Sequence, residues 1–134
     1  MPHYSDRTKL ELHKFADALA TLHEAAVVPE DRMARDSLLL RYVYTFELAW
    51  QTMLFVLQDR GDRETPRLAF AVLETGFKVG LVRDPALWKA MRAARNAVVH
   101  AYDEGVAMAL SAFVRGSAMA ELDRLFRALE EGTP

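Results

Sequence analysis

The sequence predicts an all-α fold, an up-down antiparallel helical bundle of about five helices in a single domain over residues 1–134. Three observations support this prediction. Apolar residues recur at spacings of three and four, which is the period of an amphipathic helix. Alternating apolar and polar runs, which would predict strands, are almost absent. Proline, glycine and capping residues leave only short connections between long segments, and short connections favour antiparallel neighbours.

The first helix is predicted over residues 6–26, where apolar side chains form one stripe. It ends before Pro29, because a proline disfavours the α conformation in the residue that precedes it. The stripe consists of Leu12, Phe15, Leu19, Leu22 and Ala26.

The second helix is predicted over residues 32–60, with Asp31 as its N-cap and Gly61 just beyond its end. Its apolar residues cover most of its circumference, and Arg41, Thr45 and Thr52 leave only a thin polar stripe. A helix that is apolar nearly all round must be buried on several sides. We therefore expect this helix to be central, or to be covered by a second copy of the chain.

Three further helices are predicted, at residues 66–79, 85–99 and 103–129. Thr65-Pro66 and Asp84-Pro85 each combine a capping residue with a proline suited to a first helical turn. Gly80 would close the first of the three. We expect the two ends of the chain, residues 1–5 and 132–134, to fray.

The composition limits the classes of function. The sequence is 51% hydrophobic and 27% charged, as in an ordinary globular protein. The formal net charge of −2 means that any contact with nucleic acid must come from a local basic patch. Cysteine is absent, which excludes disulfides and thiolate metal sites and is consistent with a cytoplasmic protein. The start of the chain is polar, and apolar runs reach only about five residues against a span of ~20, so no signal peptide or membrane association is expected.

The segment from Arg95 to Tyr102 contains the residues best suited to chemistry: Arg95, Asn96, His100 and Tyr102. On one straight helix, Arg95 and His100 would point about 140° apart, by the period of about 3.6 residues per turn. Two arrangements would bring them together. The β-branched pair before His100 weakens helix, so His100 would lie in a turn. Alternatively, a two-fold dimer would place two copies of the segment in one cleft.

These residue types suit RNA cleavage without a metal or cofactor. A histidine can take the proton of a ribose 2′-hydroxyl or protonate the leaving 5′-oxygen. An arginine offers several N–H donors to the phosphate as it gains charge. Asn96 would bind phosphate or orient His100. The spacing of His13 and Asp17 would allow a metal ligand pair, but no Glu-x-x-His occurs, and no metal site is predicted.

The decapeptide that begins at Arg95, RNAVVHAYDE, resembles the RxxxxHxY signature of the HEPN superfamily. The chain is most similar to its branch of nucleotidyltransferase substrate-binding proteins, which are related to HepT-type toxins. The similarity covers about half the chain, roughly residues 35–104. The matching blocks are Arg35-Asp36-Ser37, Arg41, Tyr44 to Trp50, Thr65-Pro66-Arg67, Gly76 to Val82 and Leu87-Trp88.

The resemblance implies a homodimer or higher homo-oligomer with a genomically adjacent minimal nucleotidyltransferase as partner. In toxin members the motif is a metal-independent ribonuclease site between protomers. Arg95 would then be the phosphate arginine, Asn96 the adjacent polar residue and His100 the acid/base histidine. Tyr102 matches the tyrosine that the partner modifies with AMP to neutralise the toxin. Here Ala94 and Val99 stand where the branch often has an acidic and a hydroxyl residue.

Other interpretations stay open at the level of sequence. The protein could instead be a non-catalytic subunit that binds nucleotide or substrate for a two-component nucleotidyltransferase, or a bundle that serves assembly alone. His100 could cap or pack at a helix end, and Tyr102 could be a core tyrosine. Glu47 and Arg41 lie on a helix predicted to be buried, so we expect them to form ion pairs between helices or subunits rather than to act in catalysis.

Overall fold

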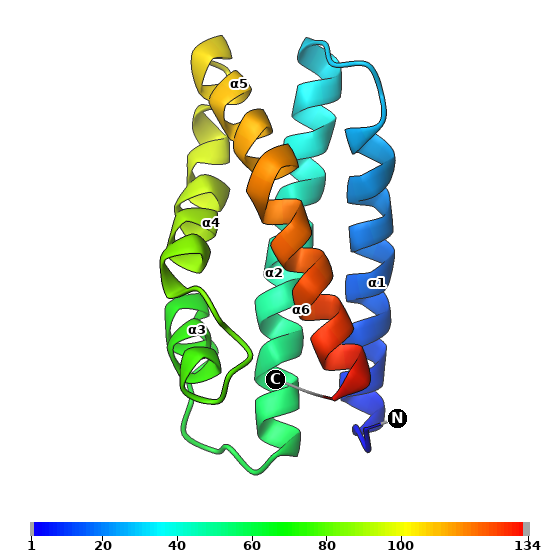
Figure 1. The fold of residues 1–134 in the computed structure, drawn as a ribbon, viewed down its shortest axis with the longest axis vertical. Coiled ribbons are helices and arrows are strands. Elements are labelled where there is room, and N and C mark those ends of the chain that lie inside the picture. The colour runs from blue at the N-terminus through cyan, green and yellow to red at the C-terminus, as the bar shows by residue number, and fades with distance from the viewer. Residues whose placement is uncertain (1, 133–134) are drawn as a thin grey trace.

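The computed structural model describes residues 2–132, and the prediction of an all-α fold is confirmed: these residues form helices and no strand (Figure 1). Within residues 2–132, no helix combines the length and the hydrophobicity of a transmembrane span. The α-helices are α1 (Asp6–Ala26), α2 (Arg32–Asp59), α3 (Ala69–Lys78), α4 (Pro85–Ala97), α5 (Glu104–Phe113) and α6 (Met119–Glu131). A 3-10 turn, η1 (Val98–His100), follows α4, and a π-helical segment, η2 (Val114–Ala118), joins α5 to α6.

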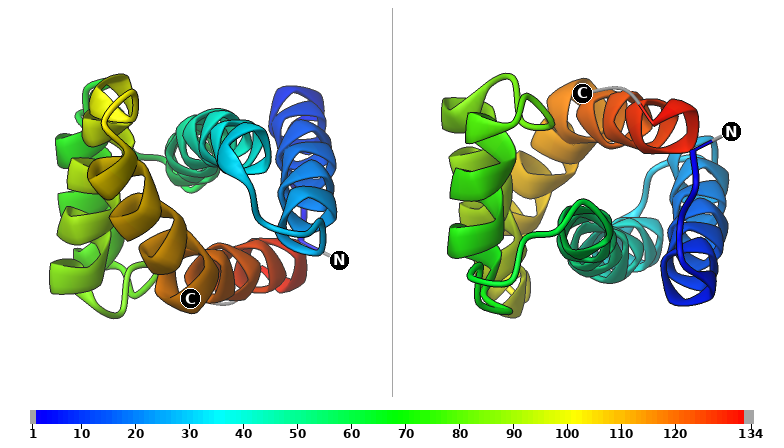
Figure 2. Two further views of the ribbon diagram at one scale, coloured as in Figure 1. Left: turned by 90° about the horizontal axis from the view of Figure 1, so that it is seen from above. Right: turned by 90° about the horizontal axis from the view of Figure 1, so that it is seen from below.

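The helices form four roughly parallel columns, which Figure 2 shows from both ends. α1 and α2 make an antiparallel hairpin. α3 and α4 follow one another along the third column, and the continuous rod α5–η2–α6 returns obliquely across α2 (Figure 1). The start of α1 and the end of α6 consequently lie at the same end of the bundle, and η1 lies near the opposite end.

Helix α2 is central, as its apolar circumference predicted, since it contacts α1, α3, α4, α5 and α6. Its buried residues supply much of the core, including Leu38, Tyr42, Phe46, Met53 and Val56. One narrow face remains open, however, and carries Leu40 (61% exposed) and Tyr44 (36% exposed).

Most predicted helix ends agree with the structure, because the capping residues act locally. Asp31 accepts a hydrogen bond from the Ala34 N–H at 2.7 Å, and Asp84 accepts one from the Leu87 N–H at 3.1 Å. Gly61, with φ +101°, follows the end of α2 in a backbone conformation that favours glycine.

The predicted start of α3 at Pro66 is wrong, because α3 begins at Ala69. The reason is a competing turn. The Asp62 carboxylate accepts hydrogen bonds from the Glu64 and Thr65 N–H groups, both at 2.9 Å, and from the Thr65 hydroxyl at 2.6 Å. Thr65 therefore belongs to an Asx-type turn and does not cap the helix.

The predicted fraying of the N-terminal end is also wrong for the residues that the structure describes. The Tyr4 hydroxyl donates to the Leu129 carbonyl, and Ser5 caps α1 through a bond from the Thr8 N–H at 3.2 Å. Gly132 adopts φ +77° at the end of α6. Residues 1, 133 and 134, for which fraying was also predicted, lie outside the described residues.

Asp59 ties the end of α2 to the start of α1, since it accepts a hydrogen bond from the Ser5 N–H at 3.0 Å. Desolvation raises the pKa of Asp59, but hydrogen bonds from Ser5 and Thr8 and the charge of Arg7 together outweigh it and hold the pKa below its usual range. A lowered folded-state pKa stabilises the protein above the unfolded pKa, and this contribution is lost as the pH falls through the folded pKa.

We therefore expect Asp59→Asn to lower the urea midpoint of unfolding at pH 7, and the difference from the unaltered chain to shrink below pH ~4, near the usual pKa of aspartate. Equal differences at pH 7 and pH 3 would show that the carboxylate charge does not contribute.

Candidate functional site

Helix α4 presents the start of the motif because its opposite face is anchored in the core. Trp88, Met91 and Ala94 are buried at helical spacing. The Tyr42 hydroxyl of α2 donates to the Met91 carbonyl at 2.7 Å, which fixes the turn of α4 that leads to Arg95. Burial raises the pKa of Tyr42, so this hydroxyl keeps its proton at neutral pH.

Arg95 lies at the edge between α4 and the open face of α2. Its side chain is 35% exposed, and its Nε donates to Glu47 Oε1 at 2.7 Å. The second carboxylate oxygen of Glu47 accepts the indole N–H of Trp50 at 3.0 Å. Within residues 2–132, the Arg95 side chain makes no other hydrogen bond, so Nη1 and Nη2 are available to a ligand.

His100 lies in a turn, as the β-branched pair before it predicted. α4 ends at Ala97, and Val98, Val99 and His100 form the 3-10 segment η1. The imidazole is exposed and packs edge-on against the Tyr102 ring, with 6.5 Å between the ring centroids. Tyr102 is 79% exposed, so the alternative of a core tyrosine is wrong.

The turn that carries His100 and Tyr102 is held by the start of α2. The Arg32 guanidinium donates to the Tyr102 carbonyl at 3.3 Å. Arg35, which is 9% exposed, forms an ion pair with Glu104 at 3.2 Å, directly after the turn. These contacts fix the backbone of the turn and leave both rings in solvent.

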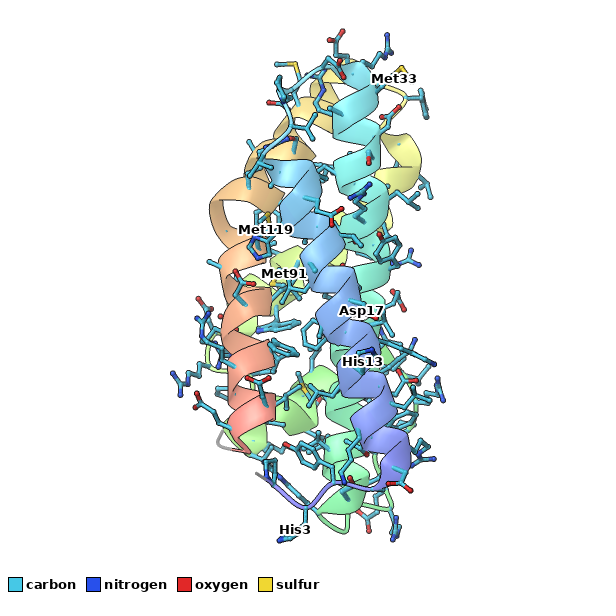
Figure 3. The ribbon with its side chains drawn as sticks, turned by 90° about the vertical axis from the view of Figure 1, so that its right-hand side faces the viewer. His3, His13, Asp17, Met33, Met91 and Met119 are labelled. Atoms are coloured by element: carbon cyan, nitrogen blue, oxygen red, sulfur yellow. The ribbon has the colours of Figure 1, made fainter. Side chains whose placement is uncertain are left out.

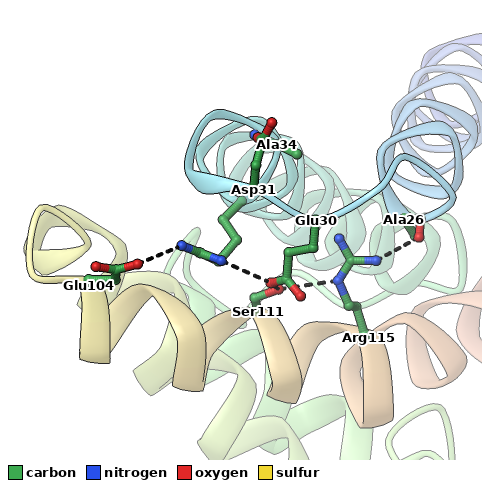
Figure 4. Close-up of polar contacts among 8 residues, drawn as sticks. Ala26, Glu30, Asp31, Ala34, Glu104, Ser111 and Arg115 are labelled. Carbon is green, nitrogen blue, oxygen red and sulfur yellow. Dashed lines mark hydrogen bonds and ion pairs between the residues drawn. The ribbon is translucent and has the colours of Figure 1, made fainter.

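A polar network continues from Arg35 across this end of the bundle (Figure 4). Glu30, in the α1–α2 loop, lies 3.8 Å from Arg35 and accepts the Ser111 hydroxyl at 2.8 Å. Arg115, in the π segment, donates to Ser111 at 3.2 Å and to the Ala26 carbonyl at 2.6 Å. The network joins the α1–α2 loop, α2 and α5 next to the motif.

All four predicted site residues therefore lie at the surface near the end of α4: Arg95 partly exposed, and Asn96, His100 and Tyr102 exposed. Among the described residues, however, no hydrogen bond joins Arg95 to His100. Five steps of α and 3-10 helix place their backbones roughly 8–9 Å apart. Arg95 reaches toward α2, whereas the His100 ring lies edge-on to Tyr102. Within one chain, the Arg95 and His100 side chains are thus both accessible to solvent but are not hydrogen-bonded to each other.

The two departures from the family pattern have structural explanations. Ala94 is 8% exposed and belongs to the core, so an acidic residue there would be largely buried. Val99 is 70% exposed, so its replacement of a hydroxyl residue removes only a surface group. Neither departure blocks access to Arg95 or His100.

Glu47 and Arg41 form ion pairs between helices, as predicted, with partners that the sequence did not identify. Glu47 pairs with Arg95, and Arg41 lies 3.5 Å from Glu24 and donates to the Thr21 carbonyl at 2.7 Å. The signal for Glu47 was a carboxylate on an otherwise apolar helix. The partner could not be found from spacing, because 48 residues separate the two.

His13 and Asp17 lie 3.5 Å apart on the outer face of α1, with both side chains about 70% exposed (Figure 3). Within residues 2–132, no group of three or more potential metal ligands gathers at one place. The pair is therefore a surface contact one helical turn apart.

An apolar groove of about 360 Å³ lies between α3 and α4. Phe70 and Phe77 line it and are 54% and 53% exposed, and Lys89 and Arg92 lie on its α4 side. We place the candidate site at the motif and not at this groove, because the groove is lined mainly by apolar side chains and its lining includes no histidine.

The described residues form an all-α bundle with the Arg95–Tyr102 segment at its surface. The chain belongs to the nucleotidyltransferase substrate binding protein like family, whose model matches residues 10–131. A crystal structure of a protein from Thermus thermophilus is similar, with 29% identity and a TM-score of 0.72; the match covers 88% of this chain and 97% of that one. No curated protein gives a significant match.

Proposed function

We propose that the chain is a cytoplasmic HEPN-type toxin subunit, a metal-independent ribonuclease with its site at a cleft between two protomers. A partner minimal nucleotidyltransferase would neutralise it. The observation that carries the proposal is the availability of Arg95 Nη1 and Nη2 and of the His100 imidazole at the same end of α4. Neither group is buried in the core. Burial of either group would be incompatible with RNA cleavage, because the group could not reach the substrate.

In the proposed reaction, two protomers supply the two proton transfers. His100 of one protomer takes the proton of a ribose 2′-hydroxyl, and the 2′-oxygen forms a bond to phosphorus as the bond from phosphorus to the 5′-oxygen breaks. The protonated His100 of the other protomer gives a proton to the leaving 5′-oxygen. Arg95 donates to the non-bridging oxygens, where charge grows in the transition state. The products are a 2′,3′-cyclic phosphate and a 5′-hydroxyl.

A dimer is proposed because one chain does not bring these groups together and because a face of α2 remains open. Leu40, Tyr44 and Glu47 follow one another at helical spacing on that face, beside Arg95. A two-fold contact through it would cover Leu40 and bring two copies of the motif toward one cleft.

The second candidate is a non-catalytic subunit that binds nucleotide or substrate for a partner nucleotidyltransferase, and the family description favours it. The same Arg95 would then bind a ligand phosphate, and His100 would transfer no proton.

Incubation of the purified chain with single-stranded RNA in the presence of a chelator separates the two candidates. We expect fragments that end in 2′,3′-cyclic phosphate and 5′-hydroxyl groups, and we expect expression of the chain alone to arrest growth. Intact RNA at equimolar protein, with the chain shown to be dimeric, would overturn the ribonuclease and favour the binding subunit.

Tyr102 is the proposed site of modification by the partner. Its hydroxyl is accessible, and an attached AMP would place negative charge and bulk beside His100. After co-expression with the neighbouring nucleotidyltransferase, we expect the intact mass to increase by adenylate and Tyr102→Phe to abolish the increase. Tyr44→Phe is the matched control, because Tyr44 is also partly exposed but its hydroxyl contacts Thr21 at 2.6 Å. An unchanged mass of the unaltered chain would refute the modification.

A further inference from the structure

The Glu47 carboxylate stands between two donors from different elements. Arg95 Nε of α4 approaches one oxygen at 2.7 Å, and Trp50 Nε1 of α2 approaches the other at 3.0 Å. Trp50 is 7% exposed, so its indole is fixed by the core. The carboxylate is in turn fixed by the indole, and the guanidinium by the carboxylate. We call the three side chains the Trp50–Glu47–Arg95 relay.

The relay restricts which edge of the Arg95 guanidinium can bind an anion. A guanidinium binds an oxyanion best through two parallel N–H bonds from one edge. Because Glu47 engages Nε, the edge formed by Nη1 and Nη2 is the one left for a phosphate. The Arg95 side chain is also 35% exposed, so without a partner its long stem would sample many rotamers.

We propose that Glu47 is a positioning residue for Arg95, holding the guanidinium through Nε so that Nη1 and Nη2 face an incoming phosphate of RNA. This role rests on the proposed function, in which Arg95 binds phosphate. Trp50 in turn orients Glu47. A carboxylate is suited to the task because both of its oxygens accept. The two donors approach different oxygens of Glu47. An amide in the same place would turn its NH2 group, which cannot accept, toward one of them.

The proposal predicts an effect opposite to that of simple electrostatics. Removing a negative charge beside a phosphate site should tighten the binding of a polyanion. Releasing a positioned arginine should weaken it, because the side chain must then be ordered by the ligand. Glu47→Gln separates the two effects, since it removes the charge and the positioning while changing the size of the side chain little.

The test measures the affinity of the full chain for a short single-stranded oligodeoxynucleotide. This probe has the phosphates of RNA but lacks the 2′-hydroxyl, so its binding is independent of cleavage. We expect Arg95→Ala to weaken binding about tenfold and Glu47→Gln about fivefold. Glu24→Gln is the matched control: it removes the same charge from the ion pair with Arg41 and is expected to leave the affinity unchanged or slightly higher.

Two further measurements test whether Glu47 acts through Arg95. The double variant Glu47→Gln, Arg95→Ala is expected to bind no more weakly than Arg95→Ala alone. In NMR spectra, the Trp50 Nε1–H and Arg95 Nε–H signals are both expected to move in Glu47→Gln. Trp50→Phe, which removes the indole N–H and keeps an apolar ring, is expected to weaken binding two- to threefold and serves if Glu47→Gln does not fold.

The outcomes distinguish this proposal from the ribonuclease. Intact RNA together with weaker oligonucleotide binding by Glu47→Gln would defeat the ribonuclease and leave the positioning role in place. Binding by Glu47→Gln as tight as that of the unaltered chain, or tighter, would overturn the positioning role whether or not RNA is cleaved. An unaltered chain that binds no better than Arg95→Ala would overturn it as well.

Discussion

Replacing His100 with alanine is expected to reduce the rate of RNA cleavage about 10²- to 10⁴-fold, the usual contribution of a general acid or base. In the proposed dimer the same residue performs both proton transfers, so the substitution removes the base of one protomer and the acid of the other. We therefore expect the loss to lie at the upper end of this range, and to appear in kcat, since Arg95 still binds the phosphate.

Structural damage would not explain such a loss, because His100 is exposed and its imidazole forms no hydrogen bond or ion pair within residues 2–132. The free energy of unfolding should change by no more than about 0.5 kcal/mol, as for most surface substitutions. His13→Ala is the matched control: His13 is exposed on α1 and is expected to leave the rate unchanged. A His100→Ala rate within threefold of the unaltered chain would show that another group transfers the proton.

The helices could largely be predicted from the sequence, because their causes are local. Apolar stripes at three- and four-residue spacing determine which segments bury a face, and Asp31 and Asp84 act on N–H groups three residues away. The prediction of α3 failed where two local signals compete. The Thr65-Pro66 pair suggests a cap, but Thr65 donates hydrogen bonds to the Asp62 carboxylate and belongs to a turn.

The π-helical segment between α5 and α6 could not be predicted from the sequence. The π segment carries Arg115, whose guanidinium reaches the Ala26 carbonyl 89 residues away in sequence. A wider turn at this point changes the direction of the side chains that follow. The periodicity of residues 103–129 shows the helix but contains no signal for the wider turn.

The sequence identifies the residues of the candidate site but not the contacts that they make. The segment from Arg95 to Tyr102 stands out in sequence because its residue types suit one chemistry, and the turn at His100 follows from the β-branched pair. The link from Arg95 to Glu47 depends on how α4 packs against α2, which Trp88, Met91 and the bond from Tyr42 determine. The orientation of the arginine is thus a consequence of core packing.

The largest expected effect on stability comes from Trp88, the residue that anchors α4. Its side chain is 1% exposed, its ring packs against Phe46 at 6.0 Å between centroids, and its indole N–H donates to Glu121 at 2.7 Å. Trp88→Ala removes the apolar contacts, opens a cavity and leaves Glu121 with Arg124 alone. We expect a loss of about 3–5 kcal/mol in the free energy of unfolding, a large part of the roughly 5–15 kcal/mol that a domain possesses.

Trp88→Phe separates the two contributions, because it keeps most of the ring and removes the N–H. It is expected to cost about 1–3 kcal/mol, as for a buried acceptor that loses a donor. Urea denaturation followed by circular dichroism measures both variants. Because Trp88 lies on the same helix as Arg95, we also expect Trp88→Ala to weaken oligonucleotide binding at temperatures where it remains folded. A loss below about 1 kcal/mol in Trp88→Ala would contradict this account of how the core holds α4.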